Sequence, residues 1–155
     1  MKALTIWQPW ATLIAIGAKP YEFRGWPAPA YVQGQRIAIH AGARPLHRAE
    51  VQELLLRLNS DEGWSTCLRR ELALPLLERA LTSPGILPTS AVVATAVLGA
   101  PLRGYEVVGE FNGPTINDSD RDEHANWAWP MRDIEVLVPP IEAKGAPGFW
   151  NWGGA

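Results

Sequence analysis

The sequence predicts an α+β fold, a small mixed β-barrel of five to six short strands with flanking helices. Two observations predict it. Short apolar runs that alternate with polar residues recur along the chain, and helical patterns separate the early runs. The chain of 155 residues contains no internal repeat, low-complexity tract or linker, so we expect a single domain over residues 1–155.

The first elements are a short strand over residues 3–7 and a helix directly after it. Pro9 suits the first turn of a helix, where its missing N–H costs no hydrogen bond. Apolar or small residues recur at Trp10 and at three, four and seven positions after it, which gives one inward stripe. Gly17 is a stop signal, so we expect the helix to end there.

A second strand is expected over residues 21–26. Pro20 favours an extended backbone at the residue before it. Side chains then alternate, which turns Tyr21 and Phe23 to one face. The opposite face of this predicted strand carries Glu22, Arg24 and Trp26.

The middle of the chain predicts one strand and two helices. The run "QRIAIHA" at 35–41 alternates as a strand, and residues 46–58 have the pattern of an amphipathic helix. Residues 64–82 also look helical, but Pro75 should break or restart that helix. The buried stripe of the helix at 46–58 should comprise Val51, Leu54, Leu55 and Leu58.

Two further strands are expected in the C-terminal part. The run "SAVVATAVLGA" at 90–100 has no charged residue, which is typical of a strand buried on both faces. Residues 104–125 should be mostly loop. "IEVLVPP" at 134–140 is the last clear strand, and the chain closes with aromatic residues among glycines.

Composition excludes several classes of protein. No apolar run reaches the roughly 18 residues that span a bilayer, and the apolar stretch at the N-terminus is too short for a signal peptide. A lone cysteine, Cys67, and histidines without zinc-ligand spacing indicate neither a disulfide nor a metal site. Phosphate-binding glycine motifs are absent. We therefore expect a cytoplasmic protein without metal, cofactor or membrane partner.

Charge is unevenly spread along the chain, although the net charge is only −2. Residues 1–49 hold six basic residues and one acidic residue, whereas residues 106–142 hold two basic and nine acidic residues. This difference could give one positively charged face that attracts nucleic acid. The two segments could equally interleave in space and cancel, and the sequence leaves both interpretations open.

Lys19 and the polar face of the second strand are the candidate site. In the simplest interpretation, Glu22 and Arg24 form a surface ion pair that contributes little. A shared face with Trp26 favours a cleft instead. A lysine partly desolvated beside an indole can act as a base or nucleophile, and an arginine can hold a phosphate or a carbonyl oxygen.

Tryptophan is unusually frequent, with eight residues that cluster near the two ends of the chain. Most of them should pack in the core. One or two at a cleft could instead stack on a nucleobase, which is worth roughly 1–3 kcal/mol per base.

Both ends of the chain resemble the ASCH domain family, whose fold is PUA-like. The resemblance covers residues 3–45 and 88–152, including the closing run "IEVLVPPIEAKGAPGFWNW". Residues 46–87 form a helical insert without a counterpart in that pattern. The motif residues are Gln8-Pro9-Trp10-Ala11 followed by Gly17-x-Lys19-x-x-Glu22-x-Arg24-x-Trp26.

The resemblance implies a small barrel with a cleft lined by the segment from Lys19 to Trp26. PUA-like relatives bind RNA or modified nucleobases. Some ASCH relatives hydrolyse the acyl amide of 4-acetylcytidine, and others are described as ribonucleases. In the amidohydrolase branch a threonine follows the lysine by three residues, whereas this chain has Glu22. A lysine paired with Glu22 stays charged, which suits phosphate binding better than nucleophilic attack.

These observations lead to two main hypotheses. The first is a module that binds RNA or a nucleotide, with contacts from Gln8, Trp10, Arg24 and Trp26, although Gln8 could merely cap its helix. The alternative is a small hydrolase, an amidohydrolase of acylated cytidine or a ribonuclease, that uses Lys19 and Glu22 as catalytic residues. In that case Thr95 might supply the missing hydroxyl, or simply satisfy its own strand.

A third hypothesis is a protein-interaction domain whose helices at 46–82 dock a partner through exposed leucines. The oligomeric state is open in all three cases. Those leucines would be Leu54, Leu55, Leu56 and Leu58.

Overall fold

A curved mixed sheet with helices against one side forms the fold, which confirms the expected α+β class. The computed structural model describes residues 1–114 and 127–154. Within them, seven strands lie in one sheet, in the order β2-β6-β4-β3-β1-β7, with β5 paired to β6. β1 and β3 are parallel, and all other pairs are antiparallel. The strands are β1 (Lys2–Ile6), β2 (Tyr21–Arg24), β3 (Arg36–Ala41), β4 (Ala91–Leu98), β5 (Leu102–Arg103), β6 (Trp127–Glu142) and β7 (Phe149–Asn151).

The sheet is a half-barrel rather than a closed barrel, because its outer strands β2 and β7 do not pair in the described part of the chain. The long strand β6 pairs with β4 along much of its length and with β2 near its start, so it joins the two parts of the sheet. The expected count of five to six strands is lower than the seven observed, because β5 and β7 were not predicted. Two and three residues are too few for an alternation to be recognised.

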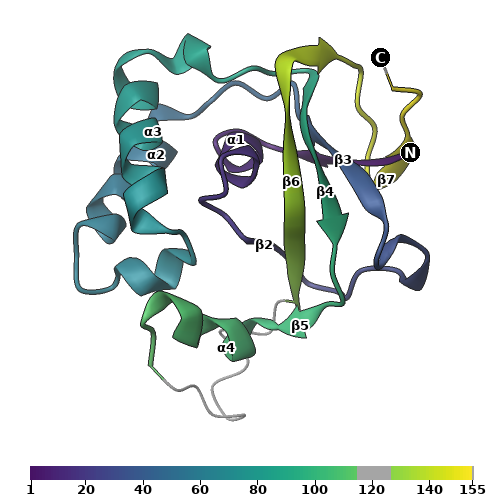
Figure 1. Cartoon of the computed structure of the whole chain (residues 1–155). Coiled ribbons are helices and arrows are strands. Elements are labelled where there is room, and N and C mark those ends of the chain that lie inside the picture. The colour runs from purple at the N-terminus through teal and green to yellow at the C-terminus, as the bar shows by residue number, and fades with distance from the viewer. Residues whose placement is uncertain (115–126, 155) are drawn as a thin grey trace.

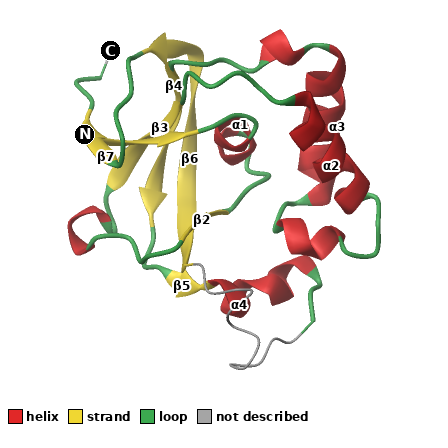
Figure 2. Ribbon diagram, turned by 180° about the vertical axis from the view of Figure 1, so that it is seen from behind, coloured by secondary structure: helices red, strands yellow, loops and turns green. Residues whose placement is uncertain are grey.

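The helices stack outward from the sheet in two further layers (Figure 1). α1 lies between the sheet and the pair formed by α2 and α3, and the view from behind shows the same arrangement (Figure 2). The four α-helices of the described residues are α1 (Trp10–Ala15), α2 (Arg48–Leu58), α3 (Arg70–Thr82) and α4 (Gly104–Val107).

α1 is central because it packs on both sides. Ile14 belongs to the core between α1 and the sheet, with Ile39 and Trp129. Leu13 belongs to a second core with Val51 of α2 and Leu77 of α3. The two cores therefore meet across a helix of six residues, and Ala18 and Lys19, which follow it closely, are buried.

The helical segment, residues 46–87, differs from expectation in two details. Leu55 is only partly buried, whereas Val51, Leu54 and Leu58 are buried as predicted. α3 begins at Arg70 and runs through Pro75 without a break. Pro75 lies on the exposed face near the start of the helix, where the carbonyl that it leaves unpaired can reach water.

The expectation of mostly loop after residue 104 is wrong for its first part. α4 and a 3₁₀ turn, η4 (Val108–Phe111), follow β5 directly. The Glu106 carboxylate accepts a hydrogen bond of 2.7 Å from the backbone N–H of Arg103, which caps α4. The acidic run at 115–126 lies outside the described residues. Over the described chain, no helix has the length and apolar character needed to cross a membrane.

Candidate functional site

A buried ion cluster of Lys19, Glu22 and Arg24 is the centre of the candidate site. Lys19 Nζ donates to Glu22 Oε1 at 3.0 Å, and Arg24 Nη2 donates to Glu22 Oε2 at 3.1 Å. Lys19 is 5% exposed and Glu22 is 8% exposed. The structure thus brings together three of the predicted site residues, with Lys19 and Glu22 buried and Arg24 partly exposed, instead of leaving a surface ion pair.

The backbone between α1 and β2 sets this geometry. Gly17 adopts φ +80°, a left-handed conformation that turns the chain at the end of α1, as predicted. The N–H groups of Ala18 and Lys19 both donate to the carbonyl of Leu13, which fixes Lys19 against the helix. β2 then pairs with β6, with Glu22 opposite Trp129. The cluster therefore lies where α1 meets the sheet.

Glu22 is ionised in spite of its burial. Burial alone would raise the pKa of this carboxyl group, but the charges of Lys19 and Arg24 and their hydrogen bonds outweigh it and hold the pKa of Glu22 below its ordinary value of 4.5. The cluster at neutral pH consequently contains two cations and one carboxylate, so it carries a net positive charge.

Two adjoining cavities open on this cluster, and we call them together the cleft. The strand-side cavity measures about 800 Å³, and the helix-side cavity measures about 540 Å³. Trp10, Glu22 and Phe23 line both of them. Arg24 lines only the strand-side cavity, and Lys19 only the helix-side cavity. The two cations of the cluster thus serve different spaces.

Aromatic rings surround the cluster. Lys19 Nζ lies 5.7 Å from the ring centre of Trp10 and 5.2 Å from that of Phe23. Trp7, directly after β1, lines the strand-side cavity and is 54% exposed. Arg44 lies over its ring, 4.1 Å from the centre. Trp7 is a site residue that sequence reasoning did not select.

Two of the predicted binding residues are placed elsewhere. Gln8 is 0% exposed, and its amide donates to Thr12 Oγ1 and the carbonyl of Pro88 while accepting from the N–H of Thr12. It therefore caps α1, the alternative role considered above. Trp26 does not share the cleft with Lys19, because β2 ends at Arg24 and the alternation ends with it.

The other polar candidates are structural. Thr95 accepts a hydrogen bond from Arg36 at 3.0 Å and lies outside both cavities. His40 is buried, with Nε2 2.7 Å from the carbonyl of Ala143 and Nδ1 3.1 Å from Thr5 Oγ1. A carbonyl only accepts, so Nε2 carries a proton and donates to it. His40 lines the strand-side cavity, but both of its ring nitrogens are occupied by these contacts.

Sequence reasoning also missed two cations at the cleft. Arg57 of α2 lines the helix-side cavity, and Lys144, an exposed residue after β6, lines the strand-side cavity. Neither lies near the motif in sequence. Together with Lys19 and Arg24 they face a single carboxylate, Glu22, across the two cavities, as far as residues 1–114 and 127–154 line them.

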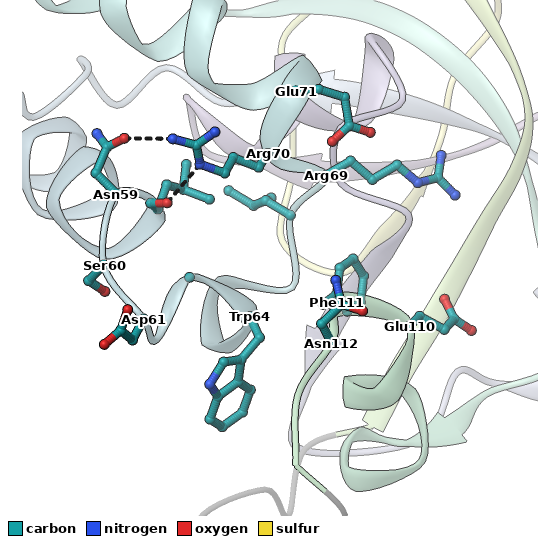
Figure 3. Close-up of a pocket in the computed structure, with 13 residues that line it drawn as sticks. Asn59, Ser60, Asp61, Trp64, Arg69, Arg70, Glu71, Glu110, Phe111 and Asn112 are labelled. Atoms are coloured by element: carbon teal, nitrogen blue, oxygen red, sulfur yellow. Dashed lines mark hydrogen bonds between the residues drawn. The ribbon is translucent and has the colours of Figure 1, made fainter.

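A third hollow, the polar cavity, lies between the helical segment and η4 (Figure 3). Its volume is about 670 Å³. Arg70 donates to the carbonyl of Leu58 and to Asn59 Oδ1, and Figure 3 shows both bonds drawn along its edge. Arg69 donates to the carbonyl of Gly17. Both arginines therefore make structural hydrogen bonds, and three carboxylates, those of Asp61, Glu71 and Glu110, line the cavity with them.

Comparisons with known proteins give a likeness of fold. No protein-family model and no curated protein matches the sequence. The chain is similar to the crystal structure of the ASCH protein ZmASCH from Zymomonas mobilis, with 17% identity and a TM-score of 0.46 over 91% of this chain and 72% of that one. Two single-residue variants of ZmASCH match with the same identity and TM-score, one over 72% and one over 74% of its chain. We draw no inference about activity from these matches.

Proposed function

We propose that the protein binds a nucleotide, free or within single-stranded RNA, in the cleft. The observation that carries this proposal is the buried Lys19–Glu22–Arg24 cluster at the wall shared by two cavities. Two cations share one carboxylate there, so a positive charge is left over. A phosphate is a ligand that supplies the missing negative charge and accepts hydrogen bonds from lysine and arginine.

Arg24 supports a phosphate contact from the strand-side cavity. In the described part of the chain, all hydrogen bonds of its guanidinium leave from Nη2, toward Glu22 and the carbonyl of Thr5. A guanidinium has five N–H donors, so Nη1 and Nε keep donors for a ligand. Lys144 adds a flexible second cation at the same cavity. Glu22 holds Arg24 in place, which lowers the entropy lost on binding.

Trp7 supports a contact with the base. More than half of its surface is exposed beside Arg24 and Lys144 in a cavity of about 800 Å³, a volume typical of small-molecule sites. A base that stacks on an indole contributes roughly 1–3 kcal/mol whatever its identity. The proposed ligand therefore places its base near Trp7 and its phosphate near Arg24.

The hydrolase alternative has weaker support. Both oxygens of Glu22 are engaged by cations, and its lowered pKa makes it a poor proton donor at neutral pH. The hydroxyl groups at the helix-side cavity, those of Ser65 and Thr66, donate to the backbone. Incubation with 4-acetylcytidine and with labelled single-stranded RNA, with and without a chelator, should therefore give no turnover. Cleavage that is lost in Lys19→Ala would favour the hydrolase.

Calorimetric titration tests the proposal. The common ribonucleoside 5′-monophosphates and a short single-stranded RNA are titrated into the wild type, Arg24→Gln and Lys144→Gln. We expect both variants to bind more weakly than the wild type. For the single-stranded RNA, the logarithm of the binding constant should also fall with the logarithm of the salt concentration, with a slope of about −0.7 per phosphate contacted. RNA binding without binding of any mononucleotide would assign the cleft to a strand. Failure of both ligands to bind the wild type would overturn the proposal.

A further inference from the structure

We infer that the helical segment supplies a phosphate-binding arginine, Arg57, which forms an anion subsite with Lys19 in the helix-side cavity. This inference rests on the proposed function and makes it more specific. Arg57 lies in α2, outside the part of the chain whose motifs predicted the cleft. The subsite would take a second phosphate, in addition to the one at Arg24, and would give the protein a preference for a nucleotide with two separate phosphates over the monophosphate of the same base.

The helix-side cavity is built from three separate parts of the chain. One wall comes from α1, β2 and the turn between them, and it includes Lys19. A second wall comes from the end of α2 and the 3₁₀ turn η2 (Gly63–Thr66), and Gly104 and Val108 complete the lining. A ligand in this space of about 540 Å³ therefore meets both the sheet side of the fold and the helical segment. The wall supplied by the helical segment consists of Arg57, Trp64, Ser65, Thr66 and Cys67.

Arg57 is oriented but has donors to spare. Its Nη2 donates to Ser65 Oγ at 2.9 Å, and the Ser65 hydroxyl in turn donates to the carbonyl of Glu62 at 2.6 Å. The Ser65 hydroxyl therefore donates its hydrogen to the carbonyl of Glu62, and its oxygen accepts the hydrogen bond from Arg57. No ion pair of Arg57 exists within residues 1–114 and 127–154. Contacts with the described residues thus use one of its five N–H donors and leave four for a ligand.

Lys19 completes the subsite from the other wall. Its ammonium donates to the carbonyl of Tyr21 and to Glu22, which uses two of its three N–H donors. The Cys67 thiol at the same cavity adds no negative charge, because burial raises its pKa to about 11. Among the described residues that line this cavity, Lys19 and Arg57 therefore face one carboxylate, which Arg24 already neutralises in part.

The experiment compares a nucleotide that carries two separate phosphates with one that carries a single phosphate. Adenosine 3′,5′-bisphosphate, adenosine 5′-monophosphate and inorganic phosphate are titrated into the wild type, Arg57→Gln, Arg57→Lys and Arg79→Gln, with thermal melting to verify the fold. Arg79 is an exposed arginine of α3 outside all three cavities, so its variant removes the same charge elsewhere. We expect Arg57→Gln to weaken the bisphosphate by about 10- to 100-fold and the monophosphate by less than about 2-fold. Arg57→Lys should recover part of the loss, and Arg79→Gln should change neither affinity.

The possible failures are distinguishable. Equal weakening of the bisphosphate and the monophosphate in Arg57→Gln, or no weakening of either, would overturn the subsite while the proposed function stands. Phosphate binding that depends on Arg57, without nucleotide binding, would keep the subsite and overturn the proposed function. Absence of binding by all three probes to the wild type would overturn both.

Discussion

Trp64 lines both the cleft and the polar cavity, yet the charges of the two hollows are balanced differently. In the polar cavity, Arg69 and Arg70 lie with three carboxylates, those of Asp61, Glu71 and Glu110. At the cleft, four cations lie with one carboxylate, that of Glu22, among the residues that the structure describes. The comparison teaches that cations around a hollow do not by themselves make an anion site. What marks such a site is an excess of cations over carboxylates.

The largest effect that we expect comes from breaking the ion cluster. Lys19→Met removes one partner of a buried carboxylate and should lower the free energy of unfolding by about 3 kcal/mol, the lower end for such pairs, because Arg24 still contacts Glu22. Urea unfolding measures it. Lys144→Met makes the same change at an exposed position and should shift stability by less than about 0.5 kcal/mol. Equal effects would mean that the cluster is not effectively buried.

The next effect separates two exposed tryptophans. Trp7 is 54% exposed and lines the cleft, whereas Trp26 is 58% exposed and does not. Trp7→Ala should weaken nucleotide binding by about 1–3 kcal/mol through lost stacking, and Trp26→Ala should leave it unchanged. Calorimetry with adenosine 5′-monophosphate measures both. A loss of nucleotide affinity in Trp26→Ala alone would instead support the cleft beside Trp26 that the strand alternation predicted.

A third variant acts on the side of the polar cavity. Tyr21 donates a hydrogen bond to Glu110, which lines that cavity. Tyr21→Phe should cost about 1 kcal/mol of stability at neutral pH and should not alter nucleotide affinity. Urea unfolding and calorimetry on the same sample measure the two quantities. Weaker nucleotide binding in this variant would show that the two hollows are coupled.

The smallest effects are the responses of the two regions to pH. The folded pKa of Glu22 is lowered, so its contribution to stability is present above the ordinary pKa of 4.5 and is lost as the pH falls below it. Burial, and then the Glu110 carboxylate, raise the pKa of Tyr21 from 10.0 to about 12, so its contribution is present below pH 10.0 and is lost as the pH rises toward 12.

Unfolding free energies across the pH range check this pair of signs. Glu22→Gln should reduce the loss of unfolding free energy at acid pH alone, and Tyr21→Phe should reduce the loss at alkaline pH alone. A variant that changed the unfolding free energy in the other pH range would contradict the assignment of these two groups.

The sequence predicts the parts of the site that depend on local pattern. The helix stop at Gly17 and the strand from Tyr21 to Arg24 follow from glycine, proline and two-residue alternation, and they bring Lys19 and Glu22 together. The prediction for Trp26 fails because alternation holds only within a strand, and β2 ends two residues earlier.

Residues that reach the cleft through tertiary packing were beyond local pattern. Arg57 looks like any solvated residue on an amphipathic helix until α2 packs against α1. Trp7 follows the last residue of β1, where sequence cannot distinguish a core indole from an exposed one. Gln8 differs in the opposite direction: it belongs to the motif and was predicted to bind the ligand, but its amide caps α1 and bonds to the backbone.

The indole N–H resonances of the tryptophans, followed during titration with adenosine 5′-monophosphate, test most directly whether the cleft is the binding site. We predict that the signals of Trp7 and Trp10 shift in proportion to saturation, whereas that of Trp26 stays in place. Assignment by single Trp→Phe variants identifies each signal. A shift at Trp26 without shifts at Trp7 and Trp10 would contradict the account.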